Sequence, residues 1–99
     1  MQNHKIKTYI GFAVKARKVV FGLDNILTSK KSVRVIVMDK SLGESSRRKL
    51  NNYLTHNEVK VVELEDISLG EDILKRDNCK IIGINDENLA KAVIDEANS

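Results

Sequence analysis

The chain has 99 residues, of which 41% are hydrophobic and 31% charged, a balance typical of one globular domain and not of a disordered chain. No apolar run approaches the ~20 residues that a membrane-spanning helix needs, and we expect no secretion signal and no membrane partner. Cys79 is the only cysteine, which excludes an internal disulfide, and these features together predict a cytoplasmic protein.

Charge is divided unevenly along the chain, although the net charge is only +3. Residues 1–60 carry 13 Lys and Arg against 4 Asp and Glu, which gives +9, and residues 61–99 carry 4 against 10, which gives −6. A basic half on a small domain is the electrostatic pattern of a nucleic-acid-binding protein. Two ordinarily solvated faces would give the same numbers, so this alternative stays open.

Helices and strands are expected to alternate from the start of the chain. The spacing of apolar residues predicts a helix over His4–Ala16 and a short strand over Val19–Phe21. A second helix is expected from Gly22 to Lys31, followed by a β-branched strand over Val33–Met38.

The tetrapeptide SLGE occurs twice, each time with the Ser-x-x-Glu spacing of a helix-capping box. We expect Ser41 to cap a helix that directs Arg47, Arg48 and Lys49 outward, and a short helix to run from Asp66 or Ser68 to Lys75. The remaining expected elements are strands over 59–64 and 80–84 and a final helix capped by Asn85 or Asp86.

Two of the expected strands are apolar at consecutive positions, over Val35–Met38 and over 80–84. Such strands are buried on both faces of a sheet. Because strands and helices alternate, the sequence predicts an α/β fold, a three-layer α/β/α sandwich with a mixed sheet of about four strands.

Residues suited to catalysis are few. The sequence has no phosphate-binding loop of the nucleotide hydrolases, no dinucleotide-binding glycine motif and no hydrolase nucleophile elbow. His4 and His56 lie far apart, Cys79 has no histidine near it in sequence, and no cluster of metal ligands is visible. We therefore expect a protein that is not an enzyme and that needs neither a cofactor nor a metal.

Residues 10–25, IGFAVKARKVVFGLDN, give the strongest indication of function. Gly22 is placed at the start of a helix, where it lets a ligand approach the backbone and the free N–H groups of the first turn. Asp24 and Asn25 follow in that turn and are expected to make a more specific contact. Cations beside a helix N-terminus favour phosphate, and here they are Lys15, Arg17 and Lys18.

The aromatic residues narrow the kind of nucleic acid. Tyr9, Phe12 and Tyr53 fall on helix faces, so a stacking platform for single strands is not expected. Phe21, next to Gly22, is the ring placed to meet a base, and a position in the core of the sheet is its alternative. No helix-turn-helix pattern indicates DNA binding. What remains is a folded RNA, recognised through its backbone and a few distorted base pairs.

Several segments form a pattern over nearly the whole chain, in the order IGFAVKARKVVFGLDNILTS, VRVIVMDK, SSRRKL, SLGEDI and KIIGINDENLAKAV. This pattern resembles the kink-turn-binding ribosomal protein family, the group of archaeal L-seven-Ae and eukaryotic L-thirty-e type with its small bacterial YlxQ-like members. The resemblance implies an L-thirty-e-like sandwich, a single RNA-binding domain over residues 1–99, and binding of structured, kink-turn-like RNA on the ribosome or elsewhere, without catalysis.

The resemblance also implies site residues. In the family, a segment at the start of the second helix reads tandem sheared G·A pairs, and it matches Gly22-Leu23-Asp24-Asn25 here, with the amide and carboxylate exchanged. Bacterial members often have glycine in place of Arg17. The remaining implied contacts are a helix position that is usually lysine and is Thr28 here, the nearby Lys30 and Lys31, and, in the loop before the last strand, Lys75 and Arg76.

An alternative function belongs to another class. The chain would then be a protein-interaction or accessory module of the ribosome, of transcription or of RNA modification, without kink-turn specificity. The acidic stretch Glu63–Asp72 offers a face for a basic protein partner.

Overall fold

One mixed sheet has the spatial strand order β1-β4-β2-β3 in the computed structural model, which describes residues 3–29, 32–76 and 78–98. The strands are β1 (Val19–Phe21), β2 (Val35–Asp39), β3 (Lys60–Leu64) and β4 (Ile81–Ile84). β2 and β3 are parallel, whereas β4 runs antiparallel to its neighbours β1 and β2. β1 and β3 are therefore the two edges of the sheet.

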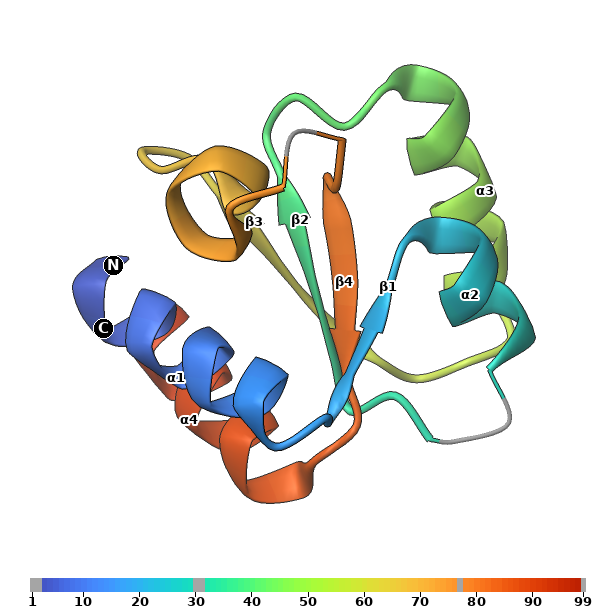
Figure 1. Ribbon diagram of the computed structural model, residues 1–99. Helices are drawn as coiled ribbons and strands as arrows, with labels where there is room; N and C mark the ends of the chain where they lie inside the picture. Colours follow the sequence, from blue (N-terminus) through green and yellow to red (C-terminus); the bar gives the residue numbers. More distant parts are fainter. Residues whose placement is uncertain (1–2, 30–31, 77, 99) are drawn as a thin grey trace.

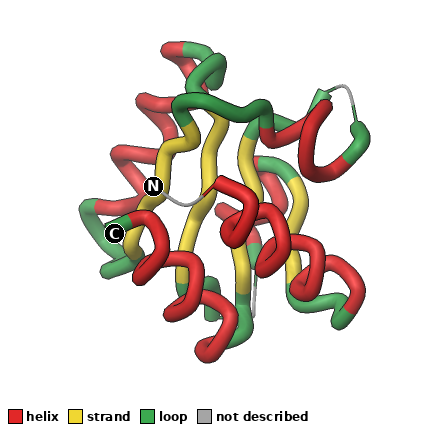
Figure 2. The backbone as a smooth tube through the Cα atoms, turned by 90° about the vertical axis from the view of Figure 1, so that its left-hand side faces the viewer, coloured by secondary structure: helices red, strands yellow, loops and turns green. Residues whose placement is uncertain are grey.

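Helices cover both faces of this sheet (Figure 1). α1 (Asn3–Lys15), α4 (Glu87–Ala97) and the short wide helix η1 (Leu69–Leu74) lie on one face, and α2 (Leu23–Thr28) and α3 (Glu44–Leu54) lie on the other. Figure 2 shows α1 and α4 side by side in front of the sheet. The predicted three-layer α/β/α sandwich with a mixed sheet is confirmed. None of the described helices is long and apolar enough to cross a membrane.

The core consists of two apolar clusters, one on each side of the sheet. β2 supplies alternate residues to both, Val35 and Val37 to the first cluster and Ile36 to the second, and all three are fully buried. The expected burial of this strand on both faces is therefore confirmed. The helices contribute Ile6, Ile10 and Val93 to the first cluster and Ile26 and Leu50 to the second.

The two SLGE segments differ in how they begin their helices. Ser68 caps η1 as expected, because its side chain accepts a hydrogen bond from the N–H of Glu71 at 3.3 Å. The expectation for Ser41 is wrong: α3 begins after Gly43 without a side-chain cap. The Ser41 hydroxyl instead donates to the buried carboxylate of Asp39, which competes successfully for it.

Two further element boundaries differ from the sequence expectation by two residues or more. α2 ends at Thr28, and the residues expected to complete it, Lys30 and Lys31, lie outside the described residues. β2 begins at Val35, two positions later than expected. Val33 is buried, and its side chain occupies the space beside Gly83, where a Cβ would lie only 2.8 Å from Val33 Cγ1.

The turn between α1 and β1 is closed by a residue in an unusual conformation. Arg17 has a φ of 58°, in the left-handed region that glycine usually occupies at a helix end. Its N–H donates to Val14 at 3.1 Å, and the N–H of Lys18 donates to Ala13 at 2.9 Å. These two bonds satisfy carbonyl groups that the end of a helix leaves open.

Arg17→Gly is expected to raise the free energy of unfolding by about 1 kcal/mol, because glycine adopts this φ without the strain of a Cβ. Urea unfolding followed by circular dichroism measures the change. Lys15→Gly is the matched control, since Lys15 lies in ordinary helix, and it should lower stability by about 0.5–1 kcal/mol. A loss of stability in Arg17→Gly would show that the arginine side chain contributes more than the strain costs.

Candidate nucleic-acid interface

Two segments far apart in the sequence meet at one end of the sheet, the upper end in Figure 1. One is the junction of β1 and α2, and the other is the loop that leads from η1 into β4. The N–H of Gly22 donates to the carbonyl of Ile81 at 3.0 Å, which ties the junction to the start of β4. The guanidinium of Arg76 lies 4.2 Å from the centre of the Phe21 ring. Both segments therefore contribute to one surface.

A shallow, open hollow of about 470 Å³ lies between the two segments. Phe21 and Gly22 line it from the junction, and Arg76, Asn78 and Cys79 line it from the loop. Phe21 is half-buried and packs against the first core cluster, which agrees with the alternative that placed this ring in the core of the sheet. The hollow thus combines an aromatic ring, a cation and an amide beside an uncovered stretch of backbone.

Gly22 has a backbone conformation that other residues rarely adopt. Its φ of 86° precedes the first turn of α2, and a Cβ added there would contact nothing within 4 Å. The requirement for glycine is therefore conformational. Among the residues that the structure describes, no side chain caps α2, so the N–H groups of its first turn are available to an anion. With six residues, α2 contributes only a small dipole, so these N–H groups are its main attraction for phosphate.

The first turn of α2 presents one amide and one carboxylate. Asn25 Nδ2 donates to the carbonyl of Phe21 at 2.8 Å, and because only the NH₂ group can donate, Oδ1 remains as the acceptor for a ligand. Asp24 is exposed, and its main-chain carbonyl accepts from the Thr28 hydroxyl at 2.9 Å. Both side chains of the turn therefore offer acceptor oxygens, whereas Thr28 bonds along its own helix.

The loop before β4 depends on a glycine that sequence reasoning did not single out. Lys75 ends η1 with a φ of 57°, and the N–H of Arg76 then donates to the Gly70 carbonyl at 2.8 Å. A Cβ on Gly70 would lie 2.4 Å from the carbonyl oxygen of Arg76 and 3.0 Å from that of Cys79. The loop folds directly over Gly70. In the sequence, only the position of Gly70 inside the second SLGE segment could have indicated its role in this loop.

Three of the cations expected beside the start of α2 do not lie there. The carbonyl of Lys18 accepts from the N–H of Asn85, beyond the end of β4, whereas Gly22 is bonded at the start of β4. At ~3.3 Å per residue of strand, Lys18 and Gly22 are roughly 13 Å apart along β1. The expectation that these cations stand beside the start of α2 is therefore wrong, because the extended strand separates them. The group at the far end of β1 is exposed and consists of Lys15, Arg17 and Lys18.

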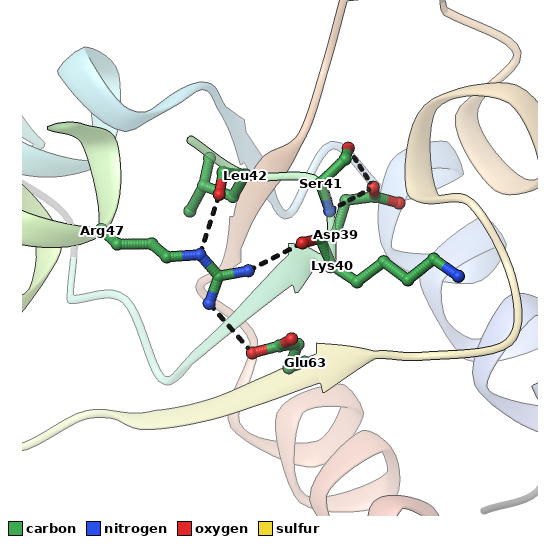
Figure 3. A network of polar contacts seen from close by, with 6 residues as sticks. All are labelled: Asp39, Lys40, Ser41, Leu42, Arg47 and Glu63. Carbon is green, nitrogen blue, oxygen red and sulfur yellow. Dashed lines mark hydrogen bonds and ion pairs between the residues drawn. The ribbon is translucent and has the colours of Figure 1, made fainter. Parts of the chain in front are cut away.

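Arg47 is engaged within the protein and does not point outward (Figure 3). Its guanidinium donates to the carbonyl of Leu42 at 2.8 Å, to the carbonyl of Lys40 at 2.9 Å and to Glu63 Oε1 at 3.1 Å. The loop between β2 and α3 needs donors for these carbonyls, and Arg47 supplies them. Among the three basic residues of α3, Arg48 and Lys49 are exposed as expected, and the expectation for Arg47 is wrong.

Asp39 connects the end of β2 to the start of η1. Its buried carboxylate accepts hydrogen bonds from the N–H of Leu69 at 2.8 Å, from the N–H of Ser41 at 3.0 Å and from the Ser41 hydroxyl. Burial alone would raise the pKa of Asp39, but the Ser41 and Leu69 hydrogen bonds and the charge of Lys80 outweigh it, so this pKa lies below its ordinary value. The carboxylate thereby fixes η1, which carries the loop before β4.

Comparison with known proteins supports the fold and says nothing of the function. No family model matches this sequence. No curated protein matches it either. A solved structure described as a protein with unknown function from Bacillus halodurans is similar to this chain, with a TM-score of 0.84, 16% identity, and coverage of 96% of this chain and 98% of that one. Within the described residues, no three His, Cys, Asp or Glu side chains gather to hold a metal.

Proposed function

We propose that this chain is a non-enzymatic, cytoplasmic RNA-binding protein that recognises structured, kink-turn-like RNA, on the ribosome or in another ribonucleoprotein. The supporting observation is that Phe21 and Gly22, which directly precede the first turn of α2, meet Arg76 around one hollow. The resemblance to the kink-turn-binding family places its RNA contacts on these same two segments. A surface with acceptor side chains, a cation and open N–H groups suits a nucleic acid whose bases are accessible.

The side chains divide into two roles. Asp24 and Asn25 Oδ1 accept hydrogen bonds from the N–H groups of guanine, which a sheared G·A pair leaves partly unpaired. Arg76 and Lys75 bind phosphate and supply affinity without sequence preference. The proposal assigns a further contact to Thr28 of α2, whereas Lys15, Arg17 and Lys18 lie at the other end of β1 and would contact only a more distant part of the RNA.

The test is a binding titration at several salt concentrations against a kink-turn RNA and a matched RNA whose G·A pairs are replaced by Watson–Crick pairs. The proposal expects the kink-turn RNA to bind about 100-fold more tightly. Asp24→Ala should remove about tenfold or more of this preference, because it deletes one base contact. Asp24 has no side-chain hydrogen bond to another described residue, so the change leaves the fold intact.

Arg76→Gln should lower the affinity for both RNAs by the same factor. It should also reduce the slope of log affinity against log salt by about one unit. Arg48→Gln is the matched control, since Arg48 is an exposed cation on α3 that does not line the hollow, and little change is expected. Equal binding of both RNAs by the unaltered protein would contradict recognition of G·A pairs. No binding of either RNA would reject the proposed function.

A further inference from the structure

β3 is an unpaired edge of the sheet. In the described part of the chain it pairs only with β2, and the proposed RNA surface includes the opposite edge, β1. In a parallel pair, every second residue directs its N–H and carbonyl groups away from the neighbouring strand. β3 therefore presents backbone donors and acceptors along its outer side. Such an edge is a template for another extended chain.

A groove follows this edge. A hollow of about 370 Å³ lies between β3 and the end of α4, with Val62, Ile94 and Ala97 among its apolar lining. A second hollow, of about 460 Å³, continues it past Lys60 at the beginning of the strand. A chain running beside β3 would thus find backbone partners, and apolar contacts for side chains on one of its faces.

The residues around the edge are mainly acidic. Glu58, Glu65 and Asp66 are exposed and flank the strand on both sides, and Lys60 is the one cation within β3. Glu63 adds a further carboxylate, although Arg47 neutralises it at 3.1 Å. The charge at this edge therefore favours a basic occupant.

A second copy of this chain is a poorer occupant of the β3 edge, because it would bring acidic residues opposite acidic residues. Symmetric antiparallel pairing of two β3 strands centred on Val62 would place Glu58 of one copy opposite Asp66 of the other. Pairing centred on Glu63 would place Glu63 opposite itself. Like charges directly opposite each other destabilise a strand pair. In these two registers the acidic residues therefore oppose self-association of the edge.

We propose that the β3 edge binds an extended, basic segment of another protein by strand addition. Apolar side chains of that segment enter the groove beside Ile94 and Ala97, and its Lys or Arg residues face Glu65 and its acidic neighbours. Because β1 and β3 are opposite edges of the sheet, this segment and an RNA bind at the same time.

The probe for the test is a labelled peptide of about eight residues with alternating Lys and Val, a length common for strands. Its binding to the whole protein is followed by fluorescence anisotropy. Two further peptides carry N-methyl groups on one or the other alternate set of backbone amides, which keeps charge and composition. Strand addition predicts that one of them binds about tenfold or more weakly and that the other binds as the parent peptide does. An alternating Glu and Val peptide should not bind.

Charge reversal on the protein locates the site. Glu65→Lys should lower the affinity of the protein for the parent peptide about fivefold. Glu87→Lys, an exposed change at the opposite end of α4 from Ala97, should leave binding unchanged, and circular dichroism verifies that both variants fold. Equal binding of the parent and both methylated peptides would overturn strand addition. An unaltered affinity in Glu65→Lys, or amide chemical-shift changes confined to residues outside β3 and α4, would overturn the site.

Discussion

Asp39→Asn is expected to lower the free energy of unfolding by about 3 kcal/mol near neutral pH. The carboxylate accepts three hydrogen bonds at a position with 6% exposure, and an amide has only one acceptor oxygen. Its NH₂ group would face the N–H of Leu69 or Ser41, which leaves buried donors opposed to each other. Urea unfolding measures the loss. Asp24→Asn is the matched control, because Asp24 is exposed, and it should change stability by less than about 0.5 kcal/mol.

The pH dependence of this loss is a second observable. The pKa of Asp39 in the folded protein lies below its unfolded value of about 3.9, so its stabilising contribution is fully present above that pH and is lost as pH falls through the folded pKa. The difference in stability between the natural protein and Asp39→Asn should therefore narrow below about pH 4. A difference that stayed constant into strong acid would show that the charge of Asp39 contributes nothing.

Gly70→Ala is expected to cost about 3 kcal/mol and to displace the loop before β4. The new Cβ would meet two backbone carbonyls, of Arg76 and Cys79, at 2.4 Å and 3.0 Å, and backbone cannot swing aside as a flexible side chain can. Gly11→Ala is the matched control, because it lies within α1 with nothing within 4 Å of its Cβ position, and it should raise stability by about 0.5–1 kcal/mol.

The same substitution separates the position of the loop from its chemistry. Gly70→Ala leaves Arg76 and Phe21 unchanged as residues but moves the guanidinium away from the ring, which changes the amide chemical shifts of the loop. Under the proposed function, RNA affinity falls although no contacting side chain has been replaced. An unchanged loop spectrum would contradict the close approach over Gly70.

The fold was predictable where the determining pattern is local. The bounds of β1 and the burial of β2 on both faces follow from short apolar runs, which depend on near neighbours in sequence. Ser41 and Arg47 were predicted wrongly because their partners are set by tertiary structure. A buried carboxylate takes the Ser41 hydroxyl, and Arg47 bonds to the preceding loop and to Glu63 of β3.

For the candidate site, the two segments were predictable but their geometry was not. The sequence singles out Gly22 through its position before a helix, and Arg76 through the resemblance. It does not show that β1 carries Lys18 to the opposite end of the sheet, because proximity in sequence is not proximity across an extended strand. Gly70 went unnoticed because its role depends on a loop that returns over it from later residues.

The position of β4 has a consequence for synthesis of the protein. β4 is the last strand of the sequence, yet it lies between β1 and β2. Until residues 81–84 have left the ribosome, β1 has no neighbour in the described sheet, and one side of β2 stays open. Closing the sheet therefore awaits residues 81–84, which pair with strands far earlier in the sequence, a non-local step of the kind that slows folding. The surface around Gly22 and Arg76 is completed in that same step, so a nascent chain does not present it early.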